Sequence, residues 1–197
     1  MSPALAIFLK APRLGTVKTR LAAEIGDVQA LGLYREMVSR TLAAAREATL
    51  DPTVWFSPVD AAEEMRLWLG EDWTLRPQSA GDLGARLATA AQSVARGRGW
   101  IAIGADCPRL GVAVLREAGA LVARGEVVLG PSADGGYYLI GGPAPLPPVF
   151  TGIRWSTSEV LDQTRTRLAA AGVAWRELPT LRDVDTAADA RAEGLLT

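Results

Sequence analysis

The spacing of apolar positions along the chain predicts a regular succession of strands and helices. Short apolar runs predict strands at 4–9, 53–57, 73–76, 100–105, 126–130, 136–141 and 174–178. Runs with Ala, Leu, Arg and Glu at helical spacing predict helices at 17–24, 28–48, 60–69, 82–96, 111–124, 157–171 and 186–193. Strands that alternate with helices form right-handed βαβ units, so the pattern indicates an α/β protein with a doubly wound sheet.

The direction of most strands follows from their composition and from the length of their connections. Runs such as 100–103 and 127–129 are apolar without interruption, which is typical of parallel strands covered on both faces. The runs 126–130 and 136–141 are joined by a segment too short for a parallel crossover. We therefore expect a mainly parallel sheet with one antiparallel strand. The Pro-rich stretch 143–148 is expected to be a surface loop.

Length and charge limit the class of protein. A chain of 197 residues with 49% apolar and 22% charged residues fits a single domain, 1–197, with a substantial core. A net charge of −1 gives no support for nucleic acid or an anionic membrane as the main partner. No apolar run approaches the roughly 20 residues of a membrane span, and the N-terminus lacks a signal-peptide pattern. We therefore expect a cytoplasmic protein.

Two residue types are informative because they are rare. The chain has no histidine, which excludes Ser-His-Asp and Cys-His catalysis and histidine-ligated zinc. Cys107 is the single cysteine and is expected to be a small packing residue, because no histidine is available to activate it. Chemistry must therefore depend on carboxylates, Lys, Arg, hydroxyls, backbone amides or a hard metal ion.

The basic residues point to a phosphate-binding loop. Of the 21 basic residues only two are lysines, and both lie in the segment 10–20. This segment contains four cations and no acid, follows the first predicted strand and precedes a helix, which is where α/β proteins bind phosphate. The candidate nucleotide ligands in it are Lys10, Arg13, Gly15, Lys18 and Arg20. The alternative is a solvated basic turn in which Thr16 caps the helix.

Two further loops carry candidate ligands for the rest of a nucleotide. Gln78 could hydrogen-bond a base or ribose, and Asp82 either contacts the ligand or caps the following helix. Gly135 belongs to a Gly-rich loop that either approaches a ligand or forms a tight turn. Tyr137 and its neighbour Tyr138 point to opposite faces of a strand, so at most one of them faces a ligand.

Trp155 and the residues after it have both a functional and a structural interpretation. Trp155 either stacks on a sugar or base or packs in the core. The spacing of Ser156 and Glu159 predicts a capping box at the start of the next helix, with Ser156 or Thr157 as the cap.

Carboxylates at loop starts are candidate metal ligands. Asp106 follows a central apolar strand, where an acid suits Mg²⁺ or Mn²⁺, since hard cations prefer oxygen. Asp183 and Asp185 point the same way if their segment is extended, and they form a second candidate pair. The alternatives are a loop hydrogen bond or a helix cap for Asp106, and capping of the last helix by Asp185 or Thr186.

The motifs together resemble one bacterial family. They are the segments 10–21, 81–84, 104–108, 130–141, 155–157 and 183–186. They resemble a glycosyltransferase family with the nucleotide-diphospho-sugar transferase (GT-A) fold, and more remotely the molybdenum-cofactor and 2-phospholactate guanylyltransferases. The resemblance implies a three-layer Rossmann-like sheet, phosphate contacts from Arg13 and Lys18, and Mg²⁺ or Mn²⁺ on Asp106. A homodimer is compatible with this resemblance.

The function implied by the resemblance is metal-dependent transfer from a nucleotide-activated sugar to a small-molecule acceptor. Lys18 would be catalytic, and Asp134 would be the base for the acceptor hydroxyl. One alternative is nucleotidyl transfer from a triphosphate to a phosphorylated acceptor, although the first loop begins Lys10-Ala-Pro12 where the guanylyltransferases have a Gly-Gly start. Another is a nucleotide-binding domain without catalysis.

Overall fold

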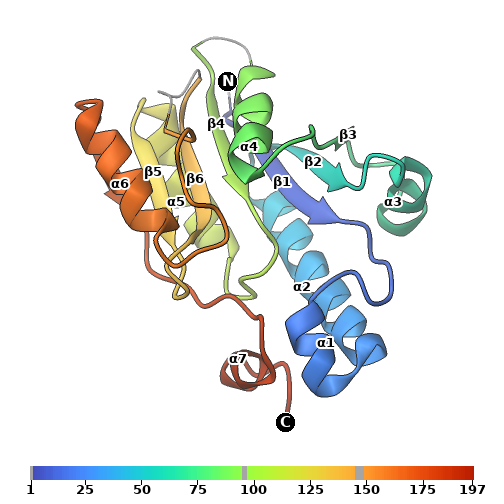
Figure 1. The fold of residues 1–197 in the computed structure, drawn as a ribbon. Coiled ribbons are helices and arrows are strands. Elements are labelled where there is room, and N and C mark those ends of the chain that lie inside the picture. The colour runs from blue at the N-terminus through green and yellow to red at the C-terminus, as the bar shows by residue number, and fades with distance from the viewer. Residues whose placement is uncertain (1, 95–96, 145–148) are drawn as a thin grey trace.

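A twisted sheet with helices on both faces forms the body of the protein (Figure 1). The computed structural model describes residues 2–94, 97–144 and 149–197. Within these ranges seven strands share one sheet. They are β1 (Ala4–Lys10), β2 (Asp51–Ser57), β3 (Leu75–Pro77), β4 (Gly99–Ile103), β5 (Val127–Pro131), β6 (Tyr137–Pro143) and β7 (Trp175–Glu177). Every predicted strand is therefore found, with ends that differ by a few residues.

The topology matches the predicted mixture of directions. The order is β3-β2-β1-β4-β6-β5-β7. β1 runs parallel to both β2 and β4, whereas β6 is antiparallel to both of its neighbours, β4 and β5. The tight connection between β5 and β6 causes the reversal, because it cannot cross the sheet. The prediction of one antiparallel strand is confirmed.

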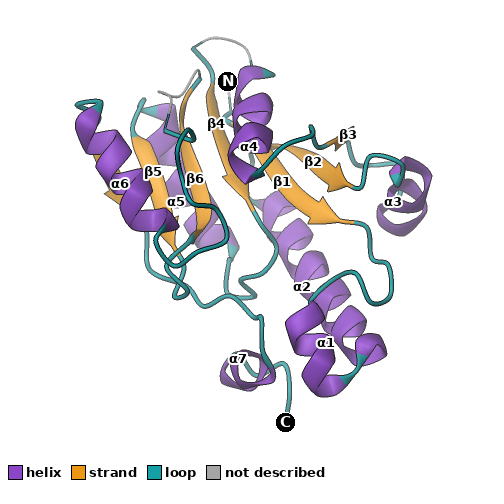
Figure 2. Cartoon of the chain, viewed as in Figure 1, coloured by secondary structure: helices purple, strands orange, loops and turns teal. Residues whose placement is uncertain are grey.

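Helices cover both faces and complete three layers (Figure 2). On one face lie α2 (Asp27–Glu47), α3 (Ala62–Leu69) and α5 (Val112–Ala123), and on the other lie α4 (Leu83–Gln92) and α6 (Val160–Ala170). β1 contributes to both cores by alternation, with Leu5, Ile7 and Leu9 toward α2 and Ala6 toward α4. Of the helices in the described part of the chain, none is long and apolar enough to cross a bilayer.

A third, smaller core joins the two ends of the chain. α1 (Thr19–Ile25) and α7 (Ala187–Ala192) lie beyond the carboxyl ends of β1 and β4 (Figure 1). Buried apolar side chains from α1, α2 and the α7 region pack together there, namely Leu21, Ala30, Leu33, Met37, Val184, Ala187 and Ala190. This core brings the C-terminal segment next to the basic first loop.

Two predicted helix caps are wrong. The Thr16 hydroxyl donates to the carbonyl of Arg13 and does not cap α1. The helix α6 has no side-chain cap, and the predicted box of Ser156 and Glu159 does not form. The Glu159 carboxylate instead accepts a hydrogen bond from the side chain of Arg154, five residues earlier, so it does not bond to the backbone of Ser156.

The ends of two predicted segments lie outside the described residues. They are residues 95–96 of the predicted helix 82–96 and residues 145–148 of the predicted Pro-rich loop. The beginning of that loop is not at the surface as expected, because Pro143 ends β6 and Ala144 is buried.

Gly84 allows α4 to pack closely against the segment that precedes α6. A Cβ at Gly84 would lie 2.7 Å from the Phe150 carbonyl oxygen and 2.7 Å from Nε1 of Trp155, whereas one at Gly32 would meet nothing within 4 Å. We expect Gly84→Ala to lower the free energy of unfolding by about 1–3 kcal/mol. Gly32→Ala should raise it by about 0.5–1 kcal/mol, since alanine is the better helix former. Urea denaturation measures both, and stabilisation by Gly84→Ala would contradict the close contact.

Candidate functional site

A cleft of about 660 Å³ opens where β1 and β4 end. In doubly wound sheets, ligands bind beyond the carboxyl ends of the strands. The cleft is lined by eight of the candidate catalytic, nucleotide-binding and metal-binding residues, namely Lys10, Lys18, Arg20, Gln78, Asp82, Asp106, Tyr137 and Asp185. These residues come from the first loop, the start of α4, the end of β4, the start of β6 and the C-terminal segment. The fold therefore gathers most of the predicted motifs around one hollow.

The ammonium group of Lys18 lies at the centre of this arrangement. Its Nζ forms an ion pair with Oδ1 of Asp106 and lies 3.1 Å from Oδ1 of Asp185. Only 5% of the Lys18 side chain is exposed. The backbone reinforces the contact between the two acidic segments, since the amide of Val184 donates to the carbonyl of Asp106 at 2.9 Å. One buried cation thus holds two carboxylates from distant parts of the chain.

Lys18 stays charged and its backbone is strained. Burial opposes the charge, but the ion pairs with Asp106 and Asp185 outweigh burial and raise the pKa of Lys18. Its backbone is left-handed, with φ 49° and ψ 45°, directly before α1. A non-glycine residue in that conformation costs on the order of 1 kcal/mol and persists only where its surroundings hold it. The ion pairs provide that restraint.

Asp106 and Asp185 are a suitable pair of ligands for a divalent metal. Their side chains are 54% and 42% exposed, so oxygens of both can be reached from the cleft. Mg²⁺ commonly binds through one or two carboxylates together with waters and substrate phosphates. The described residues contain no cluster of three or more acidic, cysteine or histidine ligands. The remaining ligands at this pair would therefore be water and phosphate oxygens.

Asp183 does not join Asp185 at the cleft, contrary to the prediction for a metal pair. Its Oδ1 accepts a hydrogen bond from Oγ of Ser132 at 2.8 Å. The cause is the bridge between Ser132 and Leu181, which places this part of the segment alongside the end of β5. Burial, with the nearby charge of Asp134, raises the pKa of Asp183.

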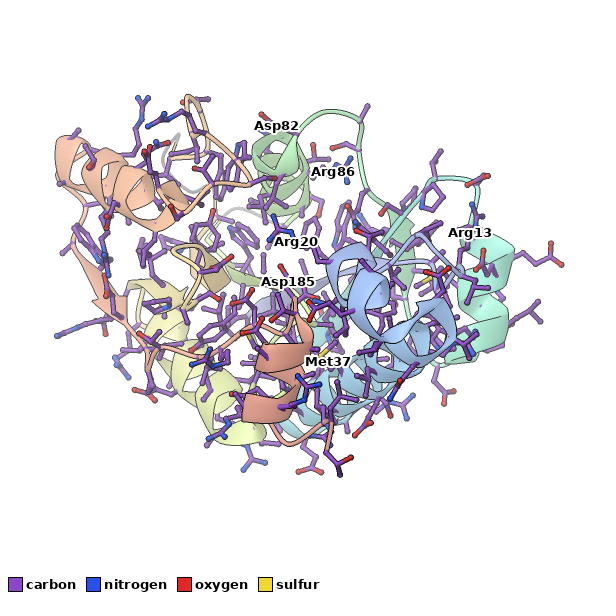
Figure 3. All side chains as sticks on the ribbon, turned by 60° about the horizontal axis from the view of Figure 1, so that its bottom comes forward. Arg13, Arg20, Met37, Asp82, Arg86 and Asp185 are labelled. Atoms are coloured by element: carbon purple, nitrogen blue, oxygen red, sulfur yellow. The ribbon has the colours of Figure 1, made fainter. Side chains whose placement is uncertain are left out.

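Arg13 is turned away from the cleft, so the geometry gives no support to its predicted phosphate contact. Its Nε donates to Glu64 at 2.8 Å, and Asp60 lies 3.6 Å from its guanidinium. Figure 3 shows Arg13 beside α3, whereas Arg20 projects near Asp185. The Arg20 side chain is 79% exposed and lies 3.9 Å from Asp185. Among the described residues, Gly15 is likewise absent from the cleft lining.

The loop around Asp134 also lies outside the described lining of the cleft. The Asp134 carboxylate accepts from the amide of Gly136 at 2.8 Å, as in an ordinary turn. Gly135 packs against the chain before α6, where a Cβ would lie 2.1 Å from the Ser158 carbonyl oxygen. The predicted roles of Asp134 as a base and of Gly135 as a ligand therefore receive no support from this geometry.

The two aromatic candidates pack against each other. The rings of Tyr137 and Trp155 meet edge to face with centroids 6.4 Å apart. Tyr137 lines the cleft, but burial raises the pKa of its hydroxyl, which faces away toward Thr164. Trp155 is not among the described lining residues and packs against the core, so the geometry favours the packing interpretation over stacking on a sugar or base. Tyr138 packs in the opposite core, as the alternation predicts, but it also lines the cleft, so the expectation that at most one of the two tyrosines reaches the ligand site is not met.

Gln78 and Asp82 line the cleft but are engaged in structural contacts. The Gln78 amide donates to the carbonyls of Leu9 and Trp55, at 3.2 and 2.8 Å. Its oxygen accepts from Arg86 at 3.1 Å. The Asp82 carboxylate caps α4 through the amide of Ala85 at 2.9 Å. Both residues therefore shape the wall of the cleft.

Arg86 and Tyr34 are polar residues of the cleft that the sequence reasoning missed. Arg86 lies one helical turn after Asp82, so the helical spacing carried a signal that its side chain shares that face. The hydroxyl of Tyr34 accepts from the amide of Lys10 at 2.9 Å and donates to its carbonyl at 2.8 Å. This contact spans 24 positions, and nothing in the local sequence indicates it. Buried Cys107, by contrast, packs in the core as expected, and burial raises its pKa.

Residues 41–157 match a family described as an uncharacterized protein conserved in bacteria (DUF2064). The chain belongs to this DUF2064 family. No curated protein matches it in sequence. The matched region contains β2 to β6 and includes Asp106, whereas Lys18 and Asp185 lie outside it.

Solved structures extend the likeness of this DUF2064 protein to nearly the whole chain. A protein from Desulfovibrio desulfuricans G20, described provisionally as a nucleotide-diphospho-sugar transferase, is 31% identical with a TM-score of 0.83, over 94% of this chain and 84% of its own. Rv0371c from Mycobacterium tuberculosis H37Rv, solved with manganese, is 22% identical with a TM-score of 0.58, over 99% and 98% of the two chains. A nucleotidyl transferase from Methanothermobacter thermautotrophicus is 16% identical with a TM-score of 0.59, over 96% and 95%.

These comparisons confirm the family resemblance and the fold that the sequence predicts. The two more distant structures share the fold, and the first also shares the family of this DUF2064 protein. The transferase class is confirmed as well.

A capping box fixes the start of α7 and thereby the position of Asp185. The Thr186 hydroxyl accepts from the amide of Asp189 at 3.2 Å, and the Asp189 carboxylate accepts from the amide of Thr186 at 3.0 Å. Burial acts to raise the pKa of Asp189, but the hydrogen bonds from Thr186 and Asp185 outweigh it and lower the pKa.

We expect Asp189→Asn to lower the free energy of unfolding by about 1 kcal/mol near neutral pH, as for the loss of a cap. The contribution is complete above the unfolded pKa of 3.8 and is lost as the pH falls through the lower folded value. The difference between wild type and variant should therefore shrink at acid pH, as measured by urea denaturation. Asp72→Asn, at an exposed site, is the control, and a pH-independent difference would contradict the role of the charge.

Proposed function

We propose that the protein transfers a sugar from a nucleotide diphosphate donor to a small-molecule acceptor, with Mg²⁺ or Mn²⁺ held by Asp106 and Asp185. The observation that carries the proposal is the convergence of these two carboxylates on one cation inside the cleft. Oxygen ligands of this kind suit a hard metal ion bound to a diphosphate.

The walls of the cleft suit the two halves of a nucleotide. Near α4 the lining combines the apolar side chains of Phe8, Leu83 and Leu87 with the polar side chains of Gln78, Asp82 and Arg86. Such a surface suits a base and ribose, because ligand pockets are largely apolar with a few polar groups that fix orientation. The cations that line the cleft are Lys10, Lys18, Arg20 and Arg86. The volume of about 660 Å³ lies within the usual range for such ligands.

The residues of the chain would perform distinct parts of the reaction. A bound metal would stabilise the negative charge that develops on the departing diphosphate. Arg20 and Lys10 would donate to phosphate oxygens, and Tyr34 holds the Lys10 backbone in place. The acceptor hydroxyl would attack the anomeric carbon as the bond to the diphosphate breaks, and its proton would pass to the departing phosphate oxygen or to water.

The comparisons support the proposal without deciding the bond that breaks. The relative that shares the family is described as a nucleotide-diphospho-sugar transferase, and a more distant structure contains manganese. A nucleotidyl transferase shares the fold as well. The cluster of cations in the cleft also suits a triphosphate, so nucleotidyl transfer with pyrophosphate release is the second candidate.

Loss of a carboxylate should remove the metal-dependent part of nucleotide binding. A ligand at about 100 times its Kd stabilises a protein by about 2.7 kcal/mol, which raises the Tm by several degrees. We expect nucleoside diphosphates with Mn²⁺ to raise the Tm of the wild type, and Asp106→Asn to abolish the extra shift due to the metal. Asp72→Asn should behave as wild type. An unchanged shift in Asp106→Asn would disprove the metal assignment.

The products distinguish the two candidate reactions. Incubation with nucleotide sugars and Mn²⁺ should release the nucleoside diphosphate in the presence of a suitable small-molecule acceptor. Pyrophosphate released from a nucleoside triphosphate instead would assign nucleotidyl transfer. Chromatographic analysis of a panel of both donor types, with Asp106→Asn as the inactive control, makes the distinction. Tight nucleotide binding with neither product across the panel would favour a binding domain without catalysis.

A further inference from the structure

The charges around the proposed metal site cancel one another. Asp106 and Asp185 contribute two negative charges, and Lys18 and Arg20 contribute two positive charges within 4 Å of those carboxylates. A divalent cation that enters from the cleft therefore meets no net attraction from these four groups. A pair of carboxylates without these partners would attract the same cation strongly.

Lys18 is the partner that cannot easily move away. Its side chain is 5% exposed, whereas that of Arg20 is 79% exposed. Its backbone is fixed in the left-handed conformation before α1, and its neighbour Val17 is buried in the core. Entry of a metal would leave the ammonium close behind the two carboxylates. Its repulsion of the metal is strong because little water screens it.

We infer that Lys18 is a built-in counter-ion that keeps divalent metal out of the Asp106–Asp185 site until the diphosphate of the donor arrives. The inference rests on the proposed function and adds an order of binding, in which the diphosphate binds before the metal. The phosphates add negative charge beside Arg20, so the site becomes net negative and retains the metal. Each ligand then raises the affinity for the other by the same factor, as linkage requires.

This role differs from the phosphate contact expected of Lys18 from the sequence. Its Nζ lies between two carboxylates, and its side chain is buried beneath them. Lys18 therefore acts on the metal by its charge, both by neutralising Asp106 and Asp185 and by repelling the metal directly. The exposed Arg20 and Lys10 remain the cations that reach the ligand.

Binding of Mn²⁺ without turnover tests the inference. Free Mn²⁺ is measured by electron paramagnetic resonance, with and without uridine or guanosine diphosphate, for the wild type and for Lys18→Met. We expect the wild type to bind Mn²⁺ at least about tenfold more tightly with one diphosphate than alone. Lys18→Met should bind Mn²⁺ alone at least about tenfold more tightly than the wild type, and the diphosphate should then add less.

Matched variants separate this effect from others. Arg40→Met also removes one positive charge, but from an exposed pair with Glu36 on α2, and should leave Mn²⁺ binding unchanged. Asp106→Asn in the Lys18→Met background should remove the gain. Lys18→Gln replaces Lys18→Met if the latter does not fold, as judged by circular dichroism.

Three results would overturn the inference. If the wild type binds Mn²⁺ alone as tightly as Lys18→Met, Lys18 does not exclude the metal, although the metal site stands. If Lys18→Met binds Mn²⁺ more weakly than the wild type, Lys18 supports the metal site instead of opposing it. If neither protein binds Mn²⁺ with or without either diphosphate, both the inference and the metal in the proposed function are wrong.

Discussion

The ion pairs of Lys18 connect three segments that are far apart in the sequence. Lys18 follows β1, Asp106 follows β4, and Asp185 lies 167 positions after Lys18 in the C-terminal segment. The buried ammonium needs both carboxylates, because an unpaired charge at 5% exposure would be costly. The carboxylates in turn would repel each other without it. The floor of the cleft therefore depends on this one contact, and the small core of α1, α2 and α7 keeps its partners in place.

The sheet makes this contact available. β1 and β4 are parallel neighbours, so the basic loop and the acidic loop leave the sheet at the same edge (Figure 1). β6 reverses direction beside β4, and its first residues close the cleft from the other side. The cap at Asp82 and the bonds of Gln78 fix the start of α4 as the opposite wall. The site thus lies on rigid elements, with Arg20 on α1 and Arg86 on α4, and the adjoining loops contribute Lys18, Asp106 and Asp185.

The sequence predicts the strands and helices well because the patterns that indicate them are local. Apolar runs and helical spacing locate the strands and helices, and the short connection before β6 reveals its direction. The end of an apolar strand also indicates Asp106. The directions of side chains are harder to predict, because they depend on partners distant in sequence. Arg13 turns toward Glu64, 51 positions away, and the Ser132 hydroxyl, also 51 positions away, bonds to Asp183. No local pattern in the chain encodes either pairing.

The central claim is that the carboxylates of Asp106 and Asp185 form one metal site at the end of β4. The most direct measurement is anomalous diffraction from crystals grown with Mn²⁺ and a nucleoside diphosphate. We predict one strong manganese peak within about 2.5 Å of oxygens from both carboxylates and in contact with the phosphates. A peak bound instead by Asp134 and Asp183, with Asp106 and Asp185 still paired only to Lys18, would contradict the account.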